Sequence, residues 1–486
     1  MTTTSKPTFV QGLGLLDSTM LVAGSMIGSG IFIVSADIAR QIGSPGWLLV
    51  VWLITSLLSL AGALCYGELA AMMPKAGGQY VYLREAFGPL WGFLYGWTLF
   101  LVIQTGTVAA VAVAFAKYLG VLMPAVSETQ VLFSIGSLPV TSAKLVAIIV
   151  LIVLTWANSR GIQAGKTVQN IFTTTKIASL LGLIILGLLL GANAGAIKAN
   201  FGGDWWAATS TAADGKTMSI GGFALLLALG TSMVGSLFSS DAWNSITFTA
   251  GEVRNPQRNI PASLLLGVGM VCVLYFITNI VYLLTLPLHG LPDGINVMQH
   301  GIQFAQLDRV GTAIAEVIFG APAAAIMAVL IMISTFGCIN GLLLSGARVY
   351  YAMSRDGLFF KSIGELSERG VPRNGLVWQC VVACLLTLSG KYGDLLDSVI
   401  FAVLIFYVLT ITGLIVLRRT RPDAERPYRT WGYPVVPLAY IAVASCIALA
   451  LLVSEKTSSN TWPGLIIVLA GVPVYAFWGR RGNKRD

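Results

Sequence analysis

Gly24-Ser25-Met26-Ile27-Gly28-Ser29-Gly30-Ile31-Phe32 places glycine and small polar residues in the middle of an apolar segment. A second apolar segment is interrupted in the same way by Phe238-Ser239-Ser240-Asp241-Ala242-Trp243-Asn244. Backbone groups in lipid must be satisfied internally, so a broken membrane helix survives only where it lines a cavity enclosed by protein. The broken ends present N–H groups to anions and carbonyl groups to cations. The two interruptions therefore predict a cavity for a zwitterion inside the membrane.

The composition is that of a chain that crosses the membrane many times. The 486 residues are 56% hydrophobic and only 10% charged, whereas a soluble domain carries about 25% charged residues. The apolar segments are long enough to cross roughly 30 Å of hydrocarbon. We expect an all-α polytopic membrane protein with twelve transmembrane helices, over residues 15–39, 46–72, 89–117, 144–159, 168–192, 220–249, 260–286, 310–340, 375–389, 394–417, 435–453 and 462–478.

The two interruptions fall in the first and the sixth segments. An odd offset of five reverses the second copy, as an inverted repeat of five plus five helices requires. Two C-terminal helices then lie outside the repeat. The expected organisation is a cytoplasmic N-terminal tail, a first five-helix repeat, a second inverted five-helix repeat, two further transmembrane helices and a cytoplasmic tail, over residues 1–14, 15–192, 219–418, 434–478 and 479–486.

The basic residues follow the membrane topology. The formal net charge is +9. Counted from a cytoplasmic N-terminus, most Lys and Arg residues fall on the cytoplasmic side, among them Arg418, Arg419 and Arg421. This asymmetry is the positive-inside rule. We expect a multi-pass protein of the plasma or inner membrane, in contact with the lipid bilayer, with both termini in the cytoplasm and no nucleic-acid partner.

No motif supports enzyme chemistry. The Gly28-Ser29-Gly30 stretch lacks the strand–turn–helix context of a nucleotide loop. The separation of His289 and His300 matches no metal-ligand pattern. No Ser or Cys nucleophile has a nearby base, so we expect no catalytic residue, no metal ion and no cofactor.

Two interpretations of the first interruption stay open. Gly24 and Gly28 form a small-xxx-small pair, which close helix packing alone would explain. Local unwinding would instead free the amides near Ser29 and Gly30 for a carboxylate. The carbonyl group of Ile27 would then be available to an ammonium group.

The second interruption contains Asp241, and a carboxylate at membrane depth usually marks a pathway. It would attract an ammonium group of the substrate, or it would cap the outer half-helix. Phe238 has the size to close over a ligand, although a lone Phe is more often a packing residue. Asn244 can donate and accept hydrogen bonds, so it would bridge the broken helix to the substrate or satisfy freed backbone.

Lys176 lies well inside the fifth apolar segment. We expect its ammonium group to point inward and bond carbonyl groups freed by the first interruption. A fixed positive charge there would stand where related architectures hold a sodium ion. Because buried lysines shift their pKa readily, Lys176 would alternatively carry a proton.

With these residues the chain resembles the amino acid–polyamine–organocation superfamily and, within it, the L-type amino acid transporters. The similarity covers nearly the whole chain. It rests on ordered motifs, which are Gly28-Ser29-Gly30-Ile31-Phe32, Gly43-Ser44-Pro45-Gly46, Gly62-Ala63-Leu64-Cys65-Tyr66-Gly67-Glu68-Leu69, Lys75-Ala76-Gly77-Gly78-Gln79-Tyr80, Trp243-Asn244, Asn255-Pro256-Gln257-Arg258-Asn259, Phe336-Gly337-Cys338-Ile339-Asn340-Gly341 and Ser354-Arg355-Asp356-Gly357.

The resemblance implies alternating access and a set of substrate-binding residues. The amino acid carboxylate would bind at the outer half of the first helix and its amine at the ends of both inner halves. Phe238 matches the gating aromatic, and Lys176 matches the lysine that replaces sodium. The implied backbone-binding set is Ile27, Gly28, Ser29, Gly30, Phe238, Ser239, Asp241 and Asn244, and the implied side-chain pocket is Val102, Ile103, Thr107, Val111, Phe401 and Leu404.

Two departures from the family pattern matter. Animal members carry a cysteine between the third and fourth helices that joins a glycoprotein heavy chain, and the loop 118–143 has none. We therefore expect no disulfide-linked heavy chain, as in prokaryotic members. Ser240-Asp241 stands where many members have an aromatic residue followed by a small one. Small neutral, large neutral and basic amino acids therefore all stay open as substrates.

The sequence predicts a sodium-independent L-amino acid exchanger that works by alternating access. One alternative is a proton-coupled amino acid uptake permease of the same fold, with Lys176 as the proton site. Another is an amino acid-sensing membrane receptor or a channel. A channel would show rings of one charge or a carbonyl filter, and the sequence shows neither.

Overall fold

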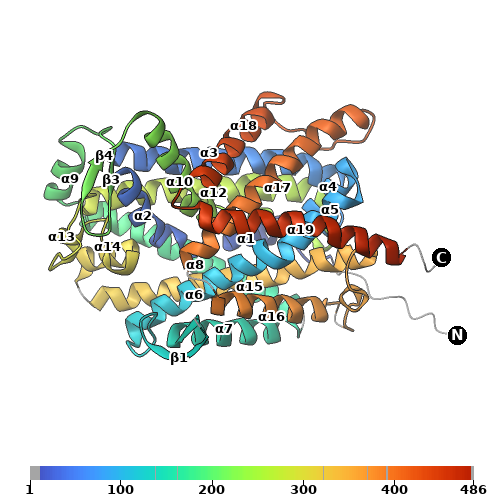
Figure 1. The fold of residues 1–486 in the computed structure, drawn as a ribbon, viewed down its shortest axis with the longest axis horizontal. Helices are drawn as coiled ribbons and strands as arrows, with labels where there is room; N and C mark the ends of the chain where they lie inside the picture. Colours follow the sequence, from blue (N-terminus) through green and yellow to red (C-terminus); the bar gives the residue numbers. More distant parts are fainter. Residues whose placement is uncertain are drawn as a thin grey trace.

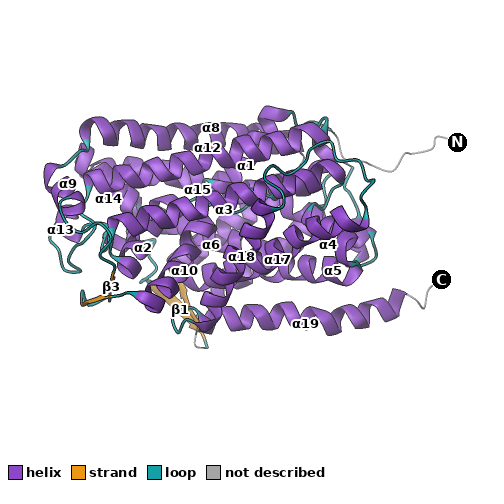
Figure 2. Ribbon diagram, turned by 90° about the horizontal axis from the view of Figure 1, so that it is seen from above, coloured by secondary structure: helices purple, strands orange, loops and turns teal. Residues whose placement is uncertain are grey.

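The computed structural model describes residues 11–136, 138–160, 162–320, 322–368, 370–389 and 392–482. Residues 1–10 of the expected N-terminal tail and residues 483–486 of the expected C-terminal tail lie outside the described residues. Long helices run between two ends of the molecule (Figure 1, Figure 2). One end, called the hairpin end below, carries β1 (Val131–Ile135) with β2 (Leu138–Thr141), β3 (Thr209–Thr211) with β4 (Thr217–Ser219), α9 (Ala194–Phe201) and α13 (Val297–His300).

Nine helical segments of the described chain are long and apolar enough to cross a membrane. They correspond to α3 (Pro45–Met72), α5 (Pro89–Thr98) continued by η2 (Leu99–Ile103) and α6 (Gln104–Leu122), α8 (Ile162–Leu190), α10 (Gly222–Ser239), α12 (Pro256–Thr285), α15 (Pro322–Arg355), α17 (Tyr392–Thr420), α18 (Val435–Val453) and α19 (Ser458–Gly482). The prediction of an all-α polytopic membrane protein is confirmed.

The other three segments of the predicted order are shorter or interrupted. The first consists of α1 (Leu15–Met26), η1 (Gly30–Phe32) and α2 (Val34–Ile42). The fourth is α7 (Ser142–Asn158), and the ninth is α16 (Arg373–Ser389). Capping residues fix where such helices begin, because they satisfy first-turn N–H groups. For example, the Thr141 hydroxyl accepts from the Lys144 amide before α7.

The eighth segment differs from its predicted bounds of 310–340. The structure has a short helix α14 (Val310–Phe319) and then the long α15, which continues to Arg355. Gly320 ends α14 with a left-handed backbone (φ 79°), and Pro322 occupies the first position of α15. Glycine after a helix and proline at the start of the next are the usual residues at such a junction. Hydropathy missed it because apolar residues continue across it.

The two interrupted segments are packed together near the middle of the bundle. α10 packs against α2 and α3, while α1 packs against α8, α12 and α15. The half-helices α2 and α10 lead to the hairpin end: the Thr209 hydroxyl of β3 bonds the Gly43 carbonyl, which follows α2, and α10 begins shortly after β4. The inverted repeats over 15–192 and 219–418 stay a prediction.

The end opposite the hairpins carries a buried ion pair, whose two residues also line a cavity of about 460 Å³. Arg348 on α15 donates through Nε and Nη2 to the Glu252 carboxylate at 2.9 and 3.3 Å, and both side chains are almost fully buried. The Glu252 carbonyl accepts from the amides of Gly12 and Leu13 at 3.0 Å each. The chain before α1 is thus fixed to η3 (Ala250–Glu252), which follows the second interruption.

Replacing Glu252 with Gln should destabilise the protein strongly. Removing one partner of a buried ion pair leaves the other charge uncompensated and costs about 3–5 kcal/mol. The measurement is thermal unfolding in detergent, and Glu252→Gln should lower the melting temperature. The double variant Glu252→Gln/Arg348→Met should recover most of the loss, because no unpaired charge remains. A double variant as unstable as the single would contradict this account.

Candidate functional site

The first interruption is an unwound stretch between α1 and η1. The backbone leaves the helix at Ile27, whose ψ is 94°, and 3-10 geometry resumes at Gly30. The predicted local unwinding is confirmed. Close packing applies to Gly24 as well, because a Cβ there would lie 2.1 Å from the Thr173 hydroxyl. The Ser29 hydroxyl is buried and has no hydrogen-bond partner among the described residues.

Side chains from two unbroken helices satisfy the carbonyl groups of Gly24 and Ile27 at this interruption. Lys176 on α8, which is 1% exposed, donates to the carbonyl oxygens of Gly24 at 2.7 Å and Ile27 at 2.8 Å. The Ser334 hydroxyl on α15 donates to the Ile27 carbonyl at 3.1 Å. This carbonyl group has two lone pairs, and both are engaged. A ligand ammonium would have to displace one of these donors.

The two interruptions are in direct contact. A Cβ at Gly30 would lie 2.0 Å from the Ser239 hydroxyl oxygen and 3.1 Å from the Ser239 Cα, so only glycine fits. The Tyr275 hydroxyl on α12 lies 3.1 Å from the Met26 carbonyl and 3.2 Å from the Ser239 carbonyl. One phenol therefore bridges both broken helices.

The second interruption follows the end of α10 at Ser239. Ala242 has a left-handed backbone (φ 64°), and helix resumes as α11 (Ser245–Phe248). A left-handed conformation is unusual for a residue other than glycine, and it persists where the surroundings fix it. Both interruptions predicted from the sequence are thus present.

Asp241 lies in this second interruption and is 8% exposed. Its Oδ1 accepts a hydrogen bond from the Tyr407 hydroxyl on α17 at 2.6 Å. The alternative in which Asp241 caps the outer half-helix is wrong, because α10 ends beside it and presents the negative end of its dipole. The expectation that the substrate amine binds at the ends of both inner halves is also wrong. The inner half α1 does end at the first interruption, with its carbonyl groups exposed there. At the second interruption the inner half α11 begins, so the carbonyl end at that interruption belongs to the outer half α10.

Asn244 connects the second interruption to two other elements. Its Nδ2 donates to Gln79 Oε1 at 3.1 Å, and Gln79 Nε2 donates to the Thr410 hydroxyl at 3.1 Å. Gln79 begins α4 (Gln79–Phe87), and Thr410 lies on α17. Asn244 therefore joins α11 to neighbouring protein rather than bonding freed backbone of its own break.

Two small cavities meet at Asp241. One of about 340 Å³ has Ile103, Thr107, Asp241 and Asn244 among its lining residues, together with Gln79, Tyr95, Leu99, Gln104, Ala242, Ser245, Phe248, Leu342, Val403, Phe406 and Tyr407. The other, of about 300 Å³, is lined by Asp241 and Leu404 and by Leu58, Ser59, Leu237, Ser240, Trp243, Ile400, Val403, Tyr407 and Tyr440.

The remaining expected pocket residues lie elsewhere. Val102, Val111 and Phe401 are buried but are not among the lining residues of either cavity. Phe401 faces α19, where a Cβ at Gly464 would lie 3.9 Å from its ring. Gly28, Ser29, Gly30, Phe238 and Ser239 are likewise buried at the interruptions without lining these two cavities.

Sequence reasoning missed the tyrosine and serine partners of the interruptions. Tyr275, Ser334 and Tyr407 each lie in an ordinary apolar helix, where a hydroxyl carries no local signal. Gln79 belongs to a motif that the resemblance quoted, but nothing in the sequence linked it to Asn244.

The fold and the site together define a class, a polytopic membrane transporter with two broken helices in contact. The model of the family described as amino acid permease matches residues 13–476. The chain belongs to this amino acid permease family. It is an amino acid transporter and not an enzyme, and the resemblance to the L-type amino acid transporters is confirmed.

Two groups of similar proteins give the degree of relatedness. The chain is 29% identical over 458 residues to the b(0,+)-type amino acid transporter 1 of Mus musculus, covering 94% of this chain and 85% of that protein. It is 30% identical over 465 residues to the large neutral amino acids transporter small subunit 2 of Homo sapiens, covering 95% and 79%.

Gly30→Ala should separate the two interruptions and abolish most transport. Overpacking of a tight contact costs about 1–3 kcal/mol, so thermal stability should fall as well. The measurement is uptake of labelled amino acid into proteoliposomes, with Gly182→Ala on α8 as the control, because a Cβ there meets nothing within 4 Å. Adding Ser239→Gly, which removes the clashing hydroxymethyl group, should restore part of the uptake. Unchanged uptake in Gly30→Ala alone would refute the contact.

Proposed function

We propose that the chain is a sodium-independent exchanger of L-amino acids that works by alternating access. The observation that supports this most strongly is the position of the Lys176 ammonium, 2.7 and 2.8 Å from the carbonyl oxygens of Gly24 and Ile27. A bound cation at the first interruption would need these same carbonyl groups. With a fixed ammonium in their place, the broken helix is stabilised without a sodium ion.

The proposed binding mode follows from the charges at the two interruptions. The substrate carboxylate binds the N–H groups at the start of η1 with the Ser29 hydroxyl, since a helix N-terminus favours anions. The ammonium group binds the carbonyl end of α10, where Asp241 adds a negative charge. Side chains then extend toward Ile103 and Thr107 in the cavity of about 340 Å³.

Access to the site is proposed to alternate between the two ends of the bundle. A cavity of about 1600 Å³ lies at the hairpin end, whereas the opposite end carries the buried Glu252–Arg348 pair. We propose that the hairpin end is extracellular, that both termini are cytoplasmic and that the protein lies in the cell membrane. The absence of cysteine from the loop 118–143 supports function without a disulfide-linked heavy chain.

Reconstitution in proteoliposomes tests the exchange mechanism. Labelled alanine should enter vesicles loaded with unlabelled amino acid, equally in sodium and in choline buffer, and should barely enter empty vesicles. Uptake into empty vesicles driven by a pH gradient would overturn exchange in favour of the proton-coupled alternative. Binding of amino acid without counterflow would instead indicate a receptor.

Lys176→Ala should abolish exchange without preventing membrane insertion, because the carbonyl groups of the first interruption lose their donor. The control is Lys198→Ala, which removes an exposed lysine from α9 and should leave exchange unchanged. Counterflow and the amount of protein in the membrane fraction are measured together. Normal exchange by Lys176→Ala would refute the proposed role of this residue.

Asp241→Asn should reduce transport of arginine and lysine while alanine transport persists, if the carboxylate binds a basic side chain. Tyr407→Phe is the matched variant, because it removes the hydrogen bond to Asp241 and keeps the charge. It should retain transport of arginine and lysine. Competition of each amino acid against labelled alanine provides the measurement. Equal loss of all substrates in Asp241→Asn would instead show that the carboxylate acts on the α-ammonium group common to all amino acids or on the structure of the site, and not on a basic side chain.

A further inference from the structure

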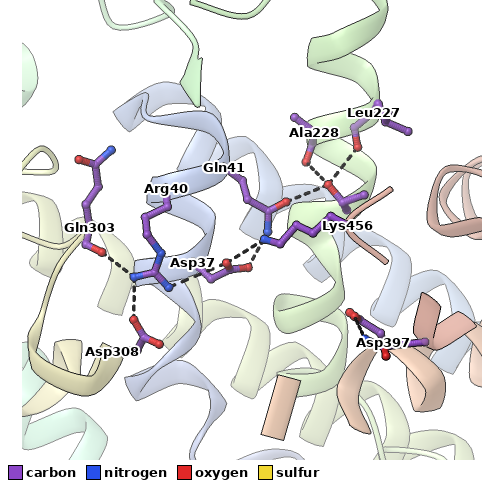
Figure 3. Close-up of polar contacts among 11 residues, drawn as sticks. Asp37, Arg40, Gln41, Leu227, Ala228, Gln303, Asp308, Asp397 and Lys456 are labelled. Atoms are coloured by element: carbon purple, nitrogen blue, oxygen red, sulfur yellow. Dashed lines mark hydrogen bonds and ion pairs between the residues drawn. The ribbon is translucent and has the colours of Figure 1, made fainter. Parts of the chain in front are cut away.

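The large cavity at the hairpin end has a balanced set of charges. Among the described residues that line it are four acidic and four basic side chains: Asp37, Glu128, Asp308, Asp397, Arg40, Lys117, Lys144 and Lys456. Several of them form contacts around α2 (Figure 3). Charged side chains around a cleft raise or lower the local concentration of charged solutes, because the low-dielectric protein focuses the electric field of those side chains into the cleft. The net charge of this cavity therefore matters for what enters it.

Arg40 is fixed among several partners. Its Nη1 donates to Asp308 Oδ1 at 2.7 Å and to the Gln303 carbonyl at 2.6 Å, and its side chain is 22% exposed. Gln303 Nε2 in turn donates to the Ala39 carbonyl at 3.0 Å. These contacts attach α2 to the segment around η4 (Gln306–Asp308). Arg40 is thus part of the wall rather than a group free to meet a solute.

The pair between Asp37 and Lys456 has a different character. Lys456 Nζ lies 3.0 Å from Asp37 Oδ1, and the two side chains are 54% and 46% exposed. Figure 3 shows Lys456 reaching toward Asp37 on α2. Gln41 Nε2 donates to the other Asp37 oxygen at 2.5 Å. Asp37 is held from its own helix, whereas Lys456 comes from the link between α18 and α19, outside the ten-helix core.

The cavity that this pair lines also reaches residues close to the two interruptions. Val34 and Gly235 also line the cavity, and they are in contact, since a Cβ at Gly235 would lie 2.4 Å from a Val34 methyl carbon. Val34 follows Gly30 by about one helical turn, and Gly235 precedes Ser239 by the same interval. The cavity therefore extends to within about one helical turn of Gly30 and Ser239 along the chain.

We propose that Lys456 is a specificity-determining residue at the entrance. It offsets the negative charge of Asp37 and so keeps the net charge of the cavity near zero, which lets zwitterions enter as readily as cations. Loss of Lys456 leaves an excess of carboxylates and favours cationic solutes over zwitterionic and anionic ones. Loss of Asp37 has the opposite effect. Exposed ion pairs contribute little to stability, so the fold should tolerate both changes. For amino acids the proposal rests on the proposed exchange function.

A cysteine in the cavity wall can report the local potential directly. Gly393 lines the cavity, is exposed and has nothing within 4 Å of an added Cβ, so Gly393→Cys is the probe, with the exposed Cys446 changed to Ser. The measured quantity is the ratio of modification rates by a cationic and an anionic methanethiosulfonate reagent. Lys456→Met should raise this ratio by about tenfold at low salt, and the effect should shrink strongly in about 0.5 M salt, because exposed charges are screened.

The matched variants separate charge from structure. Asp37→Asn should lower the ratio, and Asp37→Asn/Lys456→Met should return it close to the starting value. Lys216→Met is the control, because Lys216 pairs at 2.8 Å with Asp214 and holds the pKa of that carboxyl below its usual value, but does not line the cavity. The proposal would be overturned if Asp37→Asn and Lys456→Met shifted the ratio of modification rates in the same direction. It would also be overturned if Lys456→Met and Lys216→Met changed this ratio equally.

Transport provides the second measurement. In counterflow from the hairpin side, Lys456→Met should lower the apparent KM for arginine relative to alanine by about three- to tenfold at low salt, as expected for electrostatic steering. A changed reagent ratio with an unchanged KM ratio would overturn the role in specificity. A changed reagent ratio in a protein that exchanges no amino acid would instead overturn the proposed function and leave the electrostatic effect standing.

Discussion

The requirement that every backbone group inside the bilayer finds a partner is the constraint on which the rest of this structure depends. Unwinding at Ile27 and Ser239 exposes carbonyl groups that no helix can satisfy. Lys176 on α8, Ser334 on α15 and Tyr275 on α12 donate to them instead. All three donors are carried by long unbroken helices, so the interruptions are held by a rigid frame. The broken helices are therefore part of the stable fold and not a local defect in it.

The same donors determine what a ligand can use. The Ile27 carbonyl is already engaged, while the start of η1 and the buried Ser29 hydroxyl are available. At the second interruption the polarity is reversed, with the carbonyl end of α10 beside the Asp241 carboxylate. The direct contact of Gly30 with Ser239 brings these two environments together. An environment that favours an anion next to one that favours a cation suits the two charged groups of one amino acid.

The breaks and Lys176 could be predicted from the sequence because each violates a local rule, either a run of glycine and serine or a charge within an apolar segment. Hydropathy also gave most helix positions, but it could not separate α14 from α15, since apolar residues continue across Gly320. The roles of Tyr275 and Tyr407 depend on which helices pack together, and a tyrosine in an apolar helix gives no sign of that. For the same reason the resemblance alone did not locate Phe401, which faces α19.

Charge acts differently at the interruptions and at the entrance. Lys176 and Asp241 are buried, so little water screens them, and each single charge acts strongly on the groups beside it. At the entrance the Asp37–Lys456 pair is about half exposed, and the field of each charge fades within about 8 Å at physiological ionic strength. A solute there responds to the sum of nearby charges more than to any one contact. The entrance can therefore discriminate by net charge, whereas the interruptions can discriminate by the positions of charged groups within the molecule.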